Sequence, residues 1–287
     1  MTTHIYTGDQ RVDALDPRDR GFAYGDGVFE TILIHRGEAV WWAAHLQRLA
    51  LGCETLGIQM PEPGFLRIEV DALAAGCARG VLKLTVTRGA GARGYAPTSG
   101  APATTVLTLS EPPAPAPRAG LNLRWCETRL AIQPRLAGIK HLNRLEQVLA
   151  RAEWSDAWSR QSSIHEGLQC DTAGRVICAT SANLFVLLGG RWLTPSIADC
   201  GIAGICRSWV LQHVAGAADV VVSRRDVESA DALILCNSVR GILPVAALGS
   251  RLWPSPHPQT IALRQRLAEA EPAFDLANDL HDASEEA

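Results

Sequence analysis

Lysine is scarce in this chain, and its placement points to chemistry that arginine cannot perform. Lys140 is one of two lysines among 287 residues, the other being Lys83, whereas arginine supplies 25 of the 27 basic side chains. A lysine amine that loses its proton in a desolvated site attacks an aldehyde and forms an imine, whereas a guanidinium group stays protonated. Lys140 follows the apolar LAGI run at an expected strand-to-helix junction. We therefore interpret Lys140 as an imine-forming residue, with an ordinary surface lysine as the alternative.

A lysine imine is typical of pyridoxal phosphate chemistry, which also requires a phosphate-binding site. Gly204 precedes an expected helix, and the amides of Ile205 and Cys206 would open that helix with its positive end outward. Ser238 offers a hydroxyl group, and Arg48 offers a fixed positive charge. Each feature is common by itself, because glycine frequently precedes a helix and Arg48 also suits an exposed helix surface.

The composition indicates a globular protein that acts on a small molecule. Apolar residues make up 47% of the chain and charged residues 20%, with a net charge of −3. This balance does not favour a nucleic-acid or anionic-membrane surface, and no apolar run approaches the length of a membrane span. The start, MTTHIYTGDQ, lacks the basic and apolar regions of a signal peptide. We expect a cytoplasmic protein.

The eight cysteines are scattered without zinc-site or redox spacing, so no metal is predicted. A chain of this length does not need disulfides to fold, and we expect reduced, mostly buried thiols. The GxGxxG and GxxxxGK[ST] patterns are absent as well, which removes the usual sequence signatures of dinucleotide and nucleotide-triphosphate binding.

Strands and helices mix along the chain without a regular βαβ alternation, which favours an α+β fold. Expected strands lie at 28–40 as a hairpin, at 81–89, at 121–130, within 167–195 and within 231–245, and expected helices lie at 41–58, after Lys140 and after Gly204. The helix after Lys140 is expected to carry an apolar stripe of Leu145, Val148, Leu149 and Ala152. Lys83 lies inside its strand, on a solvated or subunit-facing side.

A proline-rich segment divides the chain. Four prolines fall within SEPPAPAPRAG (110–120), and such runs stay extended between domains. We predict a small N-terminal domain at 1–110, a linker at 111–119, a larger cofactor-binding domain at 120–275 and a frayed acidic tail at 276–287.

Several motifs occur in the order found in one enzyme family. RDRGFAYGDGVFET (18–31), HLQRL around Arg48, SANLF (181–185), GIAGICR (201–207) and CNSVRGILPV (236–245) together resemble the fold-type IV pyridoxal-phosphate enzymes. This family includes branched-chain aminotransferases, D-amino-acid aminotransferases and 4-amino-4-deoxychorismate lyases. The resemblance implies a small α/β domain followed by a larger domain with a barrel-like sheet, and a homodimer.

Two stretches resemble the lyase branch in particular, LAGIKHLNRLEQVLAR (136–151) and TRGAGARGY (87–95). The resemblance implies conversion of 4-amino-4-deoxychorismate to 4-aminobenzoate and pyruvate, for folate biosynthesis. Lys140 would be the Schiff-base and proton-transfer residue, and Arg93 would bind a substrate carboxylate or else stabilise its own loop. Arg48, Ile205, Cys206 and Ser238 would bind the cofactor phosphate.

One position departs from the family pattern. Where the family places a glutamate that pairs with the pyridine nitrogen of the cofactor, this chain has Cys178, and no glutamate occurs from 167 to 227. Asp171 lies seven residues earlier, and we expect it to point elsewhere. Three explanations stay open: a less protonated pyridine, a Cys178 thiolate paired with a pyridinium, and altered or lost activity. A cysteine that merely fills space beside the cofactor is a further alternative.

Two other functions also stay open. An aminotransferase of the same fold would use Lys140 equally well but must return a proton to the cofactor, and a binding protein could retain the cofactor without turnover. Release of pyruvate, as opposed to amino transfer to a keto acid, separates the two enzyme activities.

Overall fold

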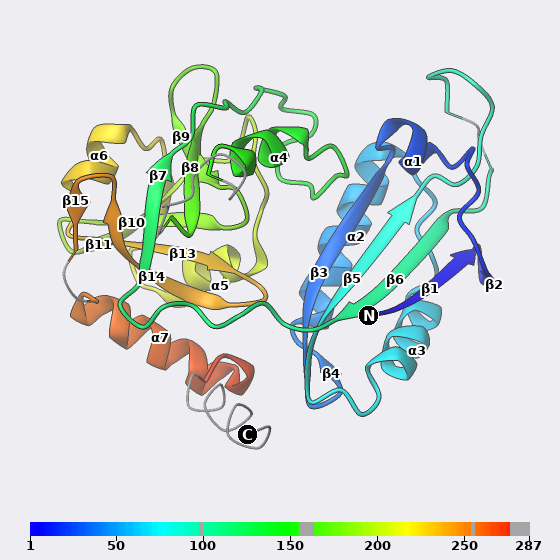
Figure 1. Cartoon of the computed structure of the whole chain (residues 1–287), viewed down its shortest axis with the longest axis horizontal. Coiled ribbons are helices and arrows are strands. Elements are labelled where there is room, and N and C mark those ends of the chain that lie inside the picture. Colours follow the sequence, from blue (N-terminus) through cyan, green and yellow to red (C-terminus); the bar gives the residue numbers. More distant parts are fainter. Residues whose placement is uncertain (98–99, 155–163, 254–255, 276–287) are drawn as a thin grey trace. The chain divides into compact units, whose positions relative to one another are not determined.

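The computed structural model describes residues 1–97, 100–154, 164–253 and 256–275, so the predicted tail at 276–287 lies outside the described residues. Contacts divide the chain into two compact units (Figure 1). The first unit comprises 1–113 together with 139–143, and the second comprises 114–138 and 144–287. The chain changes units inside the proline-rich segment, and the five residues around Lys140 return to the first unit. The predicted division into consecutive domains did not include this return of residues 139–143 to the first unit.

A six-stranded antiparallel sheet forms the first unit, with the order β2-β1-β6-β5-β3-β4. Its strands are β1 Thr2–Thr7, β2 Gln10–Val12, β3 Gly27–His35, β4 Glu38–Ala39, β5 Arg79–Thr87 and β6 Thr104–Ser110. The expected hairpin is confirmed, because β3 and β4 are joined through Arg36 and Gly37, both with positive φ.

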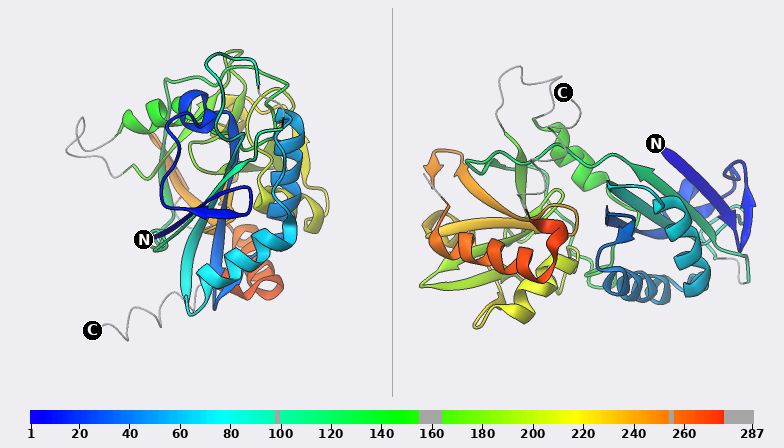
Figure 2. Two further views of the ribbon diagram at one scale, coloured as in Figure 1. Left: turned by 90° about the vertical axis from the view of Figure 1, so that its right-hand side faces the viewer. Right: turned by 90° about the horizontal axis from the view of Figure 1, so that it is seen from below.

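Helices cover one face of this sheet, as both views in Figure 2 show. They are α2 Trp42–Leu56 and α3 Pro63–Ala74, and the short helix α1 Arg20–Tyr24 comes just before β3 in the chain. The expected helix over 41–58 is confirmed and ends at Gly57, whose left-handed backbone allows its amide to bond the last turn. Gly52 lies so close to β3 that an added Cβ would approach Val28 to 2.9 Å. Alternate residues of β3, β5 and β6 pack against α2 and α3, which produces one apolar core.

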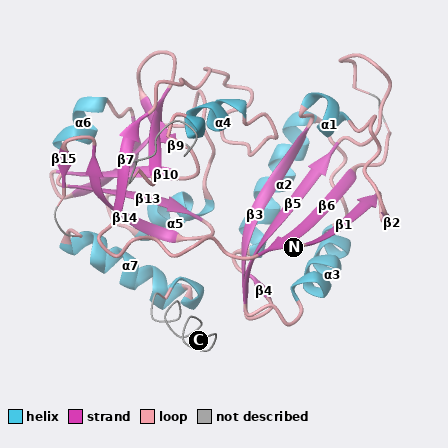
Figure 3. Ribbon diagram, viewed as in Figure 1, coloured by secondary structure: helices cyan, strands magenta, loops and turns pink. Residues whose placement is uncertain are grey.

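The second unit contains a curled sheet of nine strands, with the order β12-β11-β10-β13-β14-β7-β8-β9 and β15 on β14 (Figure 3). The strands are β7 Leu121–Trp125, β8 Glu166–Cys170, β9 Val176–Ala179, β10 Asn183–Leu188, β11 Arg191–Pro195, β12 Ala218–Val220, β13 Ala232–Asn237, β14 Gly241–Leu248 and β15 Arg251–Leu252. Val176 of β9 pairs with Val222, just beyond β12, so the two ends of the sheet meet. The predicted α+β class with a barrel-like sheet is confirmed.

The helices of this unit are α4 Leu145–Ala152, α5 Ile205–His213, α6 Arg224–Ser229 and α7 Pro258–Ala270, followed by the 3₁₀ turn η1 Pro272–Phe274. The expected helix after Gly204 is α5, and it buries Cys206, Trp209 and Val210. No helix in the described ranges is both long and apolar enough to cross a membrane.

The apolar stripe of α4 forms, but it faces outward. Leu145, Val148 and Leu149 are 75%, 58% and 60% exposed, whereas Ala150 is the buried residue of the helix. Three exposed aliphatic side chains on one short helix are unusual for a surface that faces only water.

Candidate functional site

Residues 139–143 add a short antiparallel segment to the edge of β3. The amide of Phe29 donates to the carbonyl of Lys140 at 2.9 Å, and the amide of Leu142 donates to the carbonyl of Gly27 at 2.9 Å. β4 pairs only with the far end of β3, so the first residues of β3 have this edge available. The backbone of Lys140 is therefore part of the ladder of the first sheet rather than part of a free loop.

This register decides where the lysine side chain points. Val28 lies opposite His141, so Lys140 lies opposite Phe29, and cross-strand partners project from the same face. Accordingly, the Lys140 Nζ lies 4.4 Å from the centroid of the Phe29 ring. The Nζ of Lys83, an exposed residue as expected, lies 5.2 Å from the same centroid. Both lysines of the chain thus contact one aromatic ring.

Two glycines of the YGDG stretch leave room for the lysine segment. A Cβ on Gly27 would approach the Leu142 Cδ1 to 2.7 Å, and a Cβ on Gly25 would approach the Asn143 Oδ1 to 2.7 Å. The Asn143 Nδ2 also donates to the Gly25 carbonyl at 3.2 Å. Two motifs that lie far apart in the sequence therefore fit each other directly.

The residues just before Lys140 belong to the second unit and are anchored there. The Gly138 amide donates to the Gly201 carbonyl at 3.0 Å, and the Ala203 amide donates to the Gly138 carbonyl at 2.9 Å. Lys140 comes two residues after Gly138. The lysine segment is consequently fixed on its N-terminal side by the turn that precedes α5, and on its own backbone by β3.

A buried glutamate orients Arg48 in the first unit. Arg48 donates through Nε to Glu30 Oε1 at 2.8 Å and through Nη2 to Glu30 Oε2 at 2.5 Å. His45 Nδ1 lies 2.6 Å from Glu30 Oε2. Glu30 and His45 are each 1% exposed, and Arg48 lies one helical turn after His45 on α2. Such a fork between guanidinium and carboxylate fixes the direction of the arginine.

Electrostatics keep this network in a defined charge state. Burial raises the pKa of Glu30, but the hydrogen bonds and charges of Arg48 and His45 outweigh burial and bring the pKa below its usual value. Burial lowers the pKa of His45, and the positive charges of Arg48 and Lys140 lower it further. The hydrogen bond and the negative charge of Glu30 raise it, but they do not outweigh these effects. His45 is therefore a neutral imidazole that donates from Nδ1, and its buried Nε2 has no hydrogen-bond partner within the described part of the chain.

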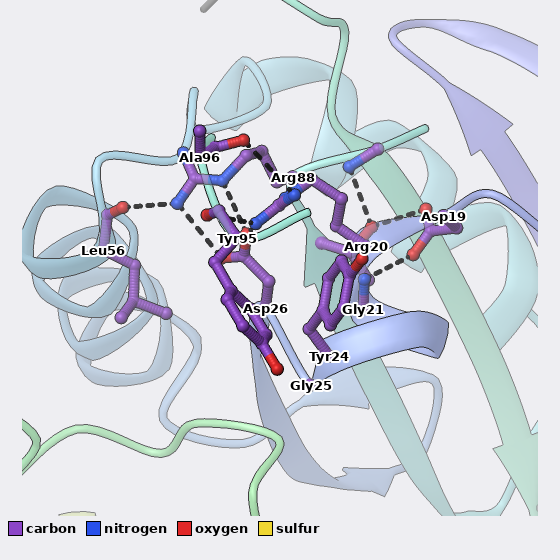
Figure 4. A network of polar contacts seen from close by, with 12 residues as sticks. Asp19, Arg20, Gly21, Tyr24, Gly25, Asp26, Leu56, Arg88, Tyr95 and Ala96 are labelled. Atoms are coloured by element: carbon purple, nitrogen blue, oxygen red, sulfur yellow. Dashed lines mark hydrogen bonds and ion pairs between the residues drawn. The ribbon is translucent and has the colours of Figure 1, made fainter. Parts of the chain in front are cut away.

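The loop that carries Arg93 is attached to the first motif by Arg20 (Figure 4). Arg20 donates to the carbonyl oxygens of Gly94 and Tyr95 at 2.9 and 3.0 Å, and to Asp26 at 2.8 Å. Arg93 itself is exposed. The loop backbone is thus held by a buried arginine while the Arg93 side chain stays accessible.

The same aspartate joins this loop to α2. Arg88 donates to Asp26 through Nε and Nη2 at 2.7 and 3.0 Å, and to the carbonyl oxygens of Leu56 and Gly57 at 2.6 and 2.7 Å (Figure 4). One carboxylate shared by two arginines therefore connects the 18–31 motif, the 87–95 motif and the end of the helix that carries Arg48.

The N-terminus of α5 suits an anion. Its N-cap is Gly204, which offers no side-chain cap, so the first amides are not satisfied by a capping side chain. A Cβ on Gly204 would approach the Asn183 Oδ1 to 1.9 Å, which explains the need for glycine. These features fit the predicted phosphate contacts of Ile205 and Cys206.

Ser238 belongs to the same region of the second unit. The fully buried thiols of Cys206 and Cys236 are hydrogen-bonded to each other, which joins α5 to the end of β13. Asn237 follows Cys236, and its side chain accepts from the amides of Val239 and Arg240, which turns the chain at Ser238. The structure thus brings together the three predicted phosphate residues of this unit. All eight cysteines are free, and seven of them are buried, as expected.

Cys178 lies on β9 and is 8% exposed. Burial raises the pKa of its thiol to about 12, so by itself the buried group is a protonated S–H at neutral pH. Asp171 does not replace the missing acid, because it accepts from the Ala173 and Arg175 amides and pairs with the Arg175 side chain at 2.6 Å. The expectation that Asp171 points elsewhere is confirmed.

Sequence reasoning missed Glu30, His45, Arg20 and Asp26. A signal for Glu30 was present, because it alternates with Val28 and Ile32 on the buried face of β3. An acid at such a position requires partners, and His45 and Arg48 have the i, i+3 spacing that presents both on one helix face. Arg20 and Asp26 gave no comparable signal, since Arg20 donates mostly to backbone carbonyl groups of a distant loop, and Asp26 accepts from Arg20 and from Arg88, which is distant in the sequence.

Comparison with known proteins shows which family the chain belongs to. The family model for class IV aminotransferases matches residues 27–248. The chain belongs to the class IV aminotransferase family. Enzymes of this family depend on pyridoxal 5′-phosphate, so this chain is a pyridoxal-phosphate-dependent enzyme.

Relatives include lyases and aminotransferases. The chain is 36% identical over 245 residues to the aminodeoxychorismate lyase of Vibrio harveyi, covering 81% of this chain and 86% of the relative. It is 25% identical to the D-alanine aminotransferase of Bacillus licheniformis, covering 82% and 83%. The crystal structure of 4-amino-4-deoxychorismate lyase from Pseudomonas aeruginosa is 41% identical, with a TM-score of 0.84 and coverage of 92% and 98%. A branched-chain aminotransferase from Thermoproteus uzoniensis, solved with norvaline, shares the fold at 17% identity and a TM-score of 0.78, with coverage of 94% and 96%.

Replacement of Glu30 tests the buried network. We expect Glu30→Gln to lower the free energy of unfolding by on the order of 3 kcal/mol, because Arg48 would lose its buried counter-charge. The folded-state pKa of Glu30 is lowered, so its contribution is present above the unfolded pKa of about 4.3 and is lost as the pH falls through the folded pKa. Denaturant unfolding of both proteins from pH 7 to pH 3 measures this, and the difference should shrink toward acid.

Glu38→Gln is the matched control. Glu38 pairs with Arg67 at 3.0 Å, but its side chain is 74% exposed. Its replacement should change the free energy of unfolding by less than about 1 kcal/mol. Equal losses for Glu30→Gln and Glu38→Gln would contradict the role assigned to the buried network.

Proposed function

We propose that this enzyme is a 4-amino-4-deoxychorismate lyase that releases 4-aminobenzoate and pyruvate, serving folate biosynthesis in the cytoplasm. The observation that carries the proposal is the fixed position of Lys140 in the lyase-like segment LAGIKHLNRLEQVLAR, paired with β3 and with its amine over Phe29. Two lyases among the relatives, at 36% and 41% identity, support this substrate class. A small-molecule substrate also agrees with the composition.

Each residue has a distinct task in the proposal. Pyridoxal phosphate, when bound, provides an aldehyde for the Lys140 amine and an extended system that accepts electrons from the substrate carbon. Lys140 would hold the cofactor aldehyde through its amine, and once the substrate amine has taken that place it would remove the proton at the carbon bearing that amine and return a proton to the departing group. Its backbone does not move in these steps because it is hydrogen-bonded to β3.

We assign the cofactor phosphate to Arg48 and to the turn around α5. The amides of Ile205 and Cys206 donate to phosphate oxygens, as does the Ser238 hydroxyl group. Glu30 supports this role because it fixes the direction of the Arg48 guanidinium group. The Cys206 thiol does not contact the phosphate in this assignment, since it is hydrogen-bonded to the thiol of Cys236.

We assign Arg93 to a substrate carboxylate. Its exposed side chain lies on a loop whose backbone is fixed by Arg20, so a positive charge is presented with little loss of backbone freedom on binding. The proposed substrate carries two carboxylates, and a guanidinium group matches either of them.

We also propose that the enzyme is a homodimer that covers the exposed face of α4. Leu145, Val148 and Leu149 form an apolar surface that a second copy of the chain would bury.

The two lysines provide a matched test of the proposed function. Purified protein mixed with pyridoxal phosphate is reduced with borohydride, and the modified peptide is mapped by mass spectrometry. The cofactor should be attached to Lys140 in the wild type and in Lys83→Ala. Lys140→Ala should lose the adduct, and pyruvate release from 4-amino-4-deoxychorismate should fall by a factor on the order of 10⁴.

Other outcomes overturn parts of the proposal separately. Attachment to Lys83, or full pyruvate release by Lys140→Ala, would remove the assigned role of Lys140. Amino transfer to a keto acid without pyruvate release would identify an aminotransferase. Arg93→Gln should raise the KM for the substrate and leave the Lys140 adduct intact, whereas an unchanged KM would reject its assignment.

Sedimentation equilibrium tests the dimer. The wild type should have twice the 30.8 kDa mass of the chain. Leu145→Glu combined with Leu149→Glu should shift the mass toward a single chain, because two charges would have to be buried. Leu51→Glu is the control, since Leu51 is 53% exposed on α2. A single-chain mass for the wild type would exclude the dimer.

A further inference from the structure

The two faces of the β8–β9 pair have different chemistry. Leu168 and Ala179 lie opposite each other and belong to the main core of the second unit. Gln169 and Cys178 also lie opposite each other, one residue along, and therefore project from the other face. Gln169 is fully buried, although carboxamides are uncommon at such positions.

The carboxamide of Gln169 is only partly satisfied. Its Nε2 donates to the Glu146 carbonyl at 3.4 Å, a long hydrogen bond, and Nε2 carries a second hydrogen. Its buried Oε1 has no hydrogen-bond partner within the described residues. Beside the residue that stands in place of the family glutamate, this buried carboxamide therefore has one N–H and its Oε1 without partners among the described residues.

Cys178 belongs to a small apolar cluster on which one positive charge acts. Apolar contacts come from Leu130 and Ile177, together with the thiol of Cys200. Burial raises the pKa of the Cys178 thiol, Cys200 raises it further, and the positive charge of Arg144 acts in the opposite direction. Arg144 is itself affected, since burial lowers the pKa of its guanidinium group.

Three more groups act on this cluster through their charge. Glu166 and Cys126 raise the pKa of the Cys178 thiol, and Glu146 acts on Arg144. The Glu166 carboxylate accepts from the Gly167 amide at 2.9 Å and from the hydroxyl groups of Thr180 and Ser181.

The carboxylates of Glu166 and Glu146 already accept hydrogen bonds from other groups. Glu166 lies two residues before Leu168 and so projects from the face opposite to Gln169. Glu146 accepts from the Ala131 amide at 2.7 Å. Neither carboxylate occupies the position that the family glutamate would have, so a positive charge on a bound ring nitrogen would lack the usual counter-charge.

We propose that Gln169, together with Cys178, takes the place of the family glutamate, and that this enzyme binds pyridoxal phosphate with its ring nitrogen unprotonated. The inference rests on the proposed cofactor chemistry at Lys140. An unprotonated pyridine nitrogen is a hydrogen-bond acceptor, which matches the second N–H of the Gln169 carboxamide and the S–H of Cys178. The Oε1 of Gln169 would accept from a protonated ring, but a neutral carboxamide offers no negative charge to balance it. A protonated ring would place a second positive charge near Arg144 in a buried site, which is unfavourable without a carboxylate.

The test reads the nitrogen directly in the full-length holoenzyme. Pyridoxal phosphate labelled with ¹⁵N in the ring is bound, and its NMR chemical shift reports whether the nitrogen carries a proton. The wild type should give the unprotonated signal at pH 7. Cys178→Glu should convert it to the protonated signal, because a carboxylate would be restored.

A second variant covers a failure of Cys178→Glu to fold. Gln169→Leu should leave the nitrogen unprotonated, change its chemical shift and weaken pyridoxal phosphate binding about two- to tenfold through loss of one neutral hydrogen bond. Gln147→Leu is the matched control, since Gln147 also has a buried Oε1 without a partner among the described residues. It should leave both the shift and the affinity unchanged.

The outcomes distinguish a failure of the proposed function from a failure of the inference about the ring nitrogen. Borohydride adduct formation at Lys140 does not depend on the ring nitrogen, so an absent adduct overturns the proposed function and this inference together. An adduct with a protonated nitrogen in the wild type overturns this inference alone. An unchanged shift and affinity in Gln169→Leu would remove Gln169 as the partner of the nitrogen.

Discussion

The hydrogen bonds between residues 139–143 and the start of β3 are the constraint on which the site depends. They pair the lysine segment with the edge of the first sheet through an isolated β-bridge, although the chain on both sides of it belongs to the second unit. Backbone pairing at this register places Lys140 opposite Phe29 and directs its amine over the ring. A flexible loop would have to lose that freedom during each turnover, whereas a paired segment has lost it during folding.

The surrounding features protect this pairing. Glycines at 25 and 27 leave space for Asn143 and Leu142, and the turn before α5 binds Gly138. Buried charge fixes the remaining polar groups of the first unit, with Glu30 shared by Arg48 and His45 and with Asp26 shared by two arginines. Both networks use one carboxylate for two partners, so loss of either acid would leave buried positive charge without compensation.

Local patterns in the sequence predicted much of the fold. The β3–β4 hairpin, α2 with its Gly57 end, and the turn into α5 follow from alternation, helical spacing and glycine placement. The outward orientation of α4 did not follow, because an apolar stripe specifies burial but not the partner that provides it. The return of residues 139–143 to the first unit was also hidden, since it depends on an open strand edge created by the shortness of β4.

Prediction of the site was limited in the same way, because local sequence patterns do not reveal contacts between distant segments. Residue chemistry identified Lys140, and motif resemblance identified Arg48 and the α5 turn. Gln169 could not be found, because its importance arises from its register opposite Cys178 and from an unused carboxamide in a buried position. Arg20 likewise acts on backbone carbonyl groups, which leave no pattern in side-chain types.

Amide hydrogen exchange at Phe29 and Leu142 tests the central claim most directly, because these two amides donate the hydrogen bonds that place Lys140 in the first sheet. The account predicts that both exchange as slowly as the amides in the middle of β3, with an opening free energy of several kcal/mol. Exchange at the rate of exposed loop amides, while the rest of β3 stays protected, would show that the lysine segment is not part of the sheet and would contradict the account.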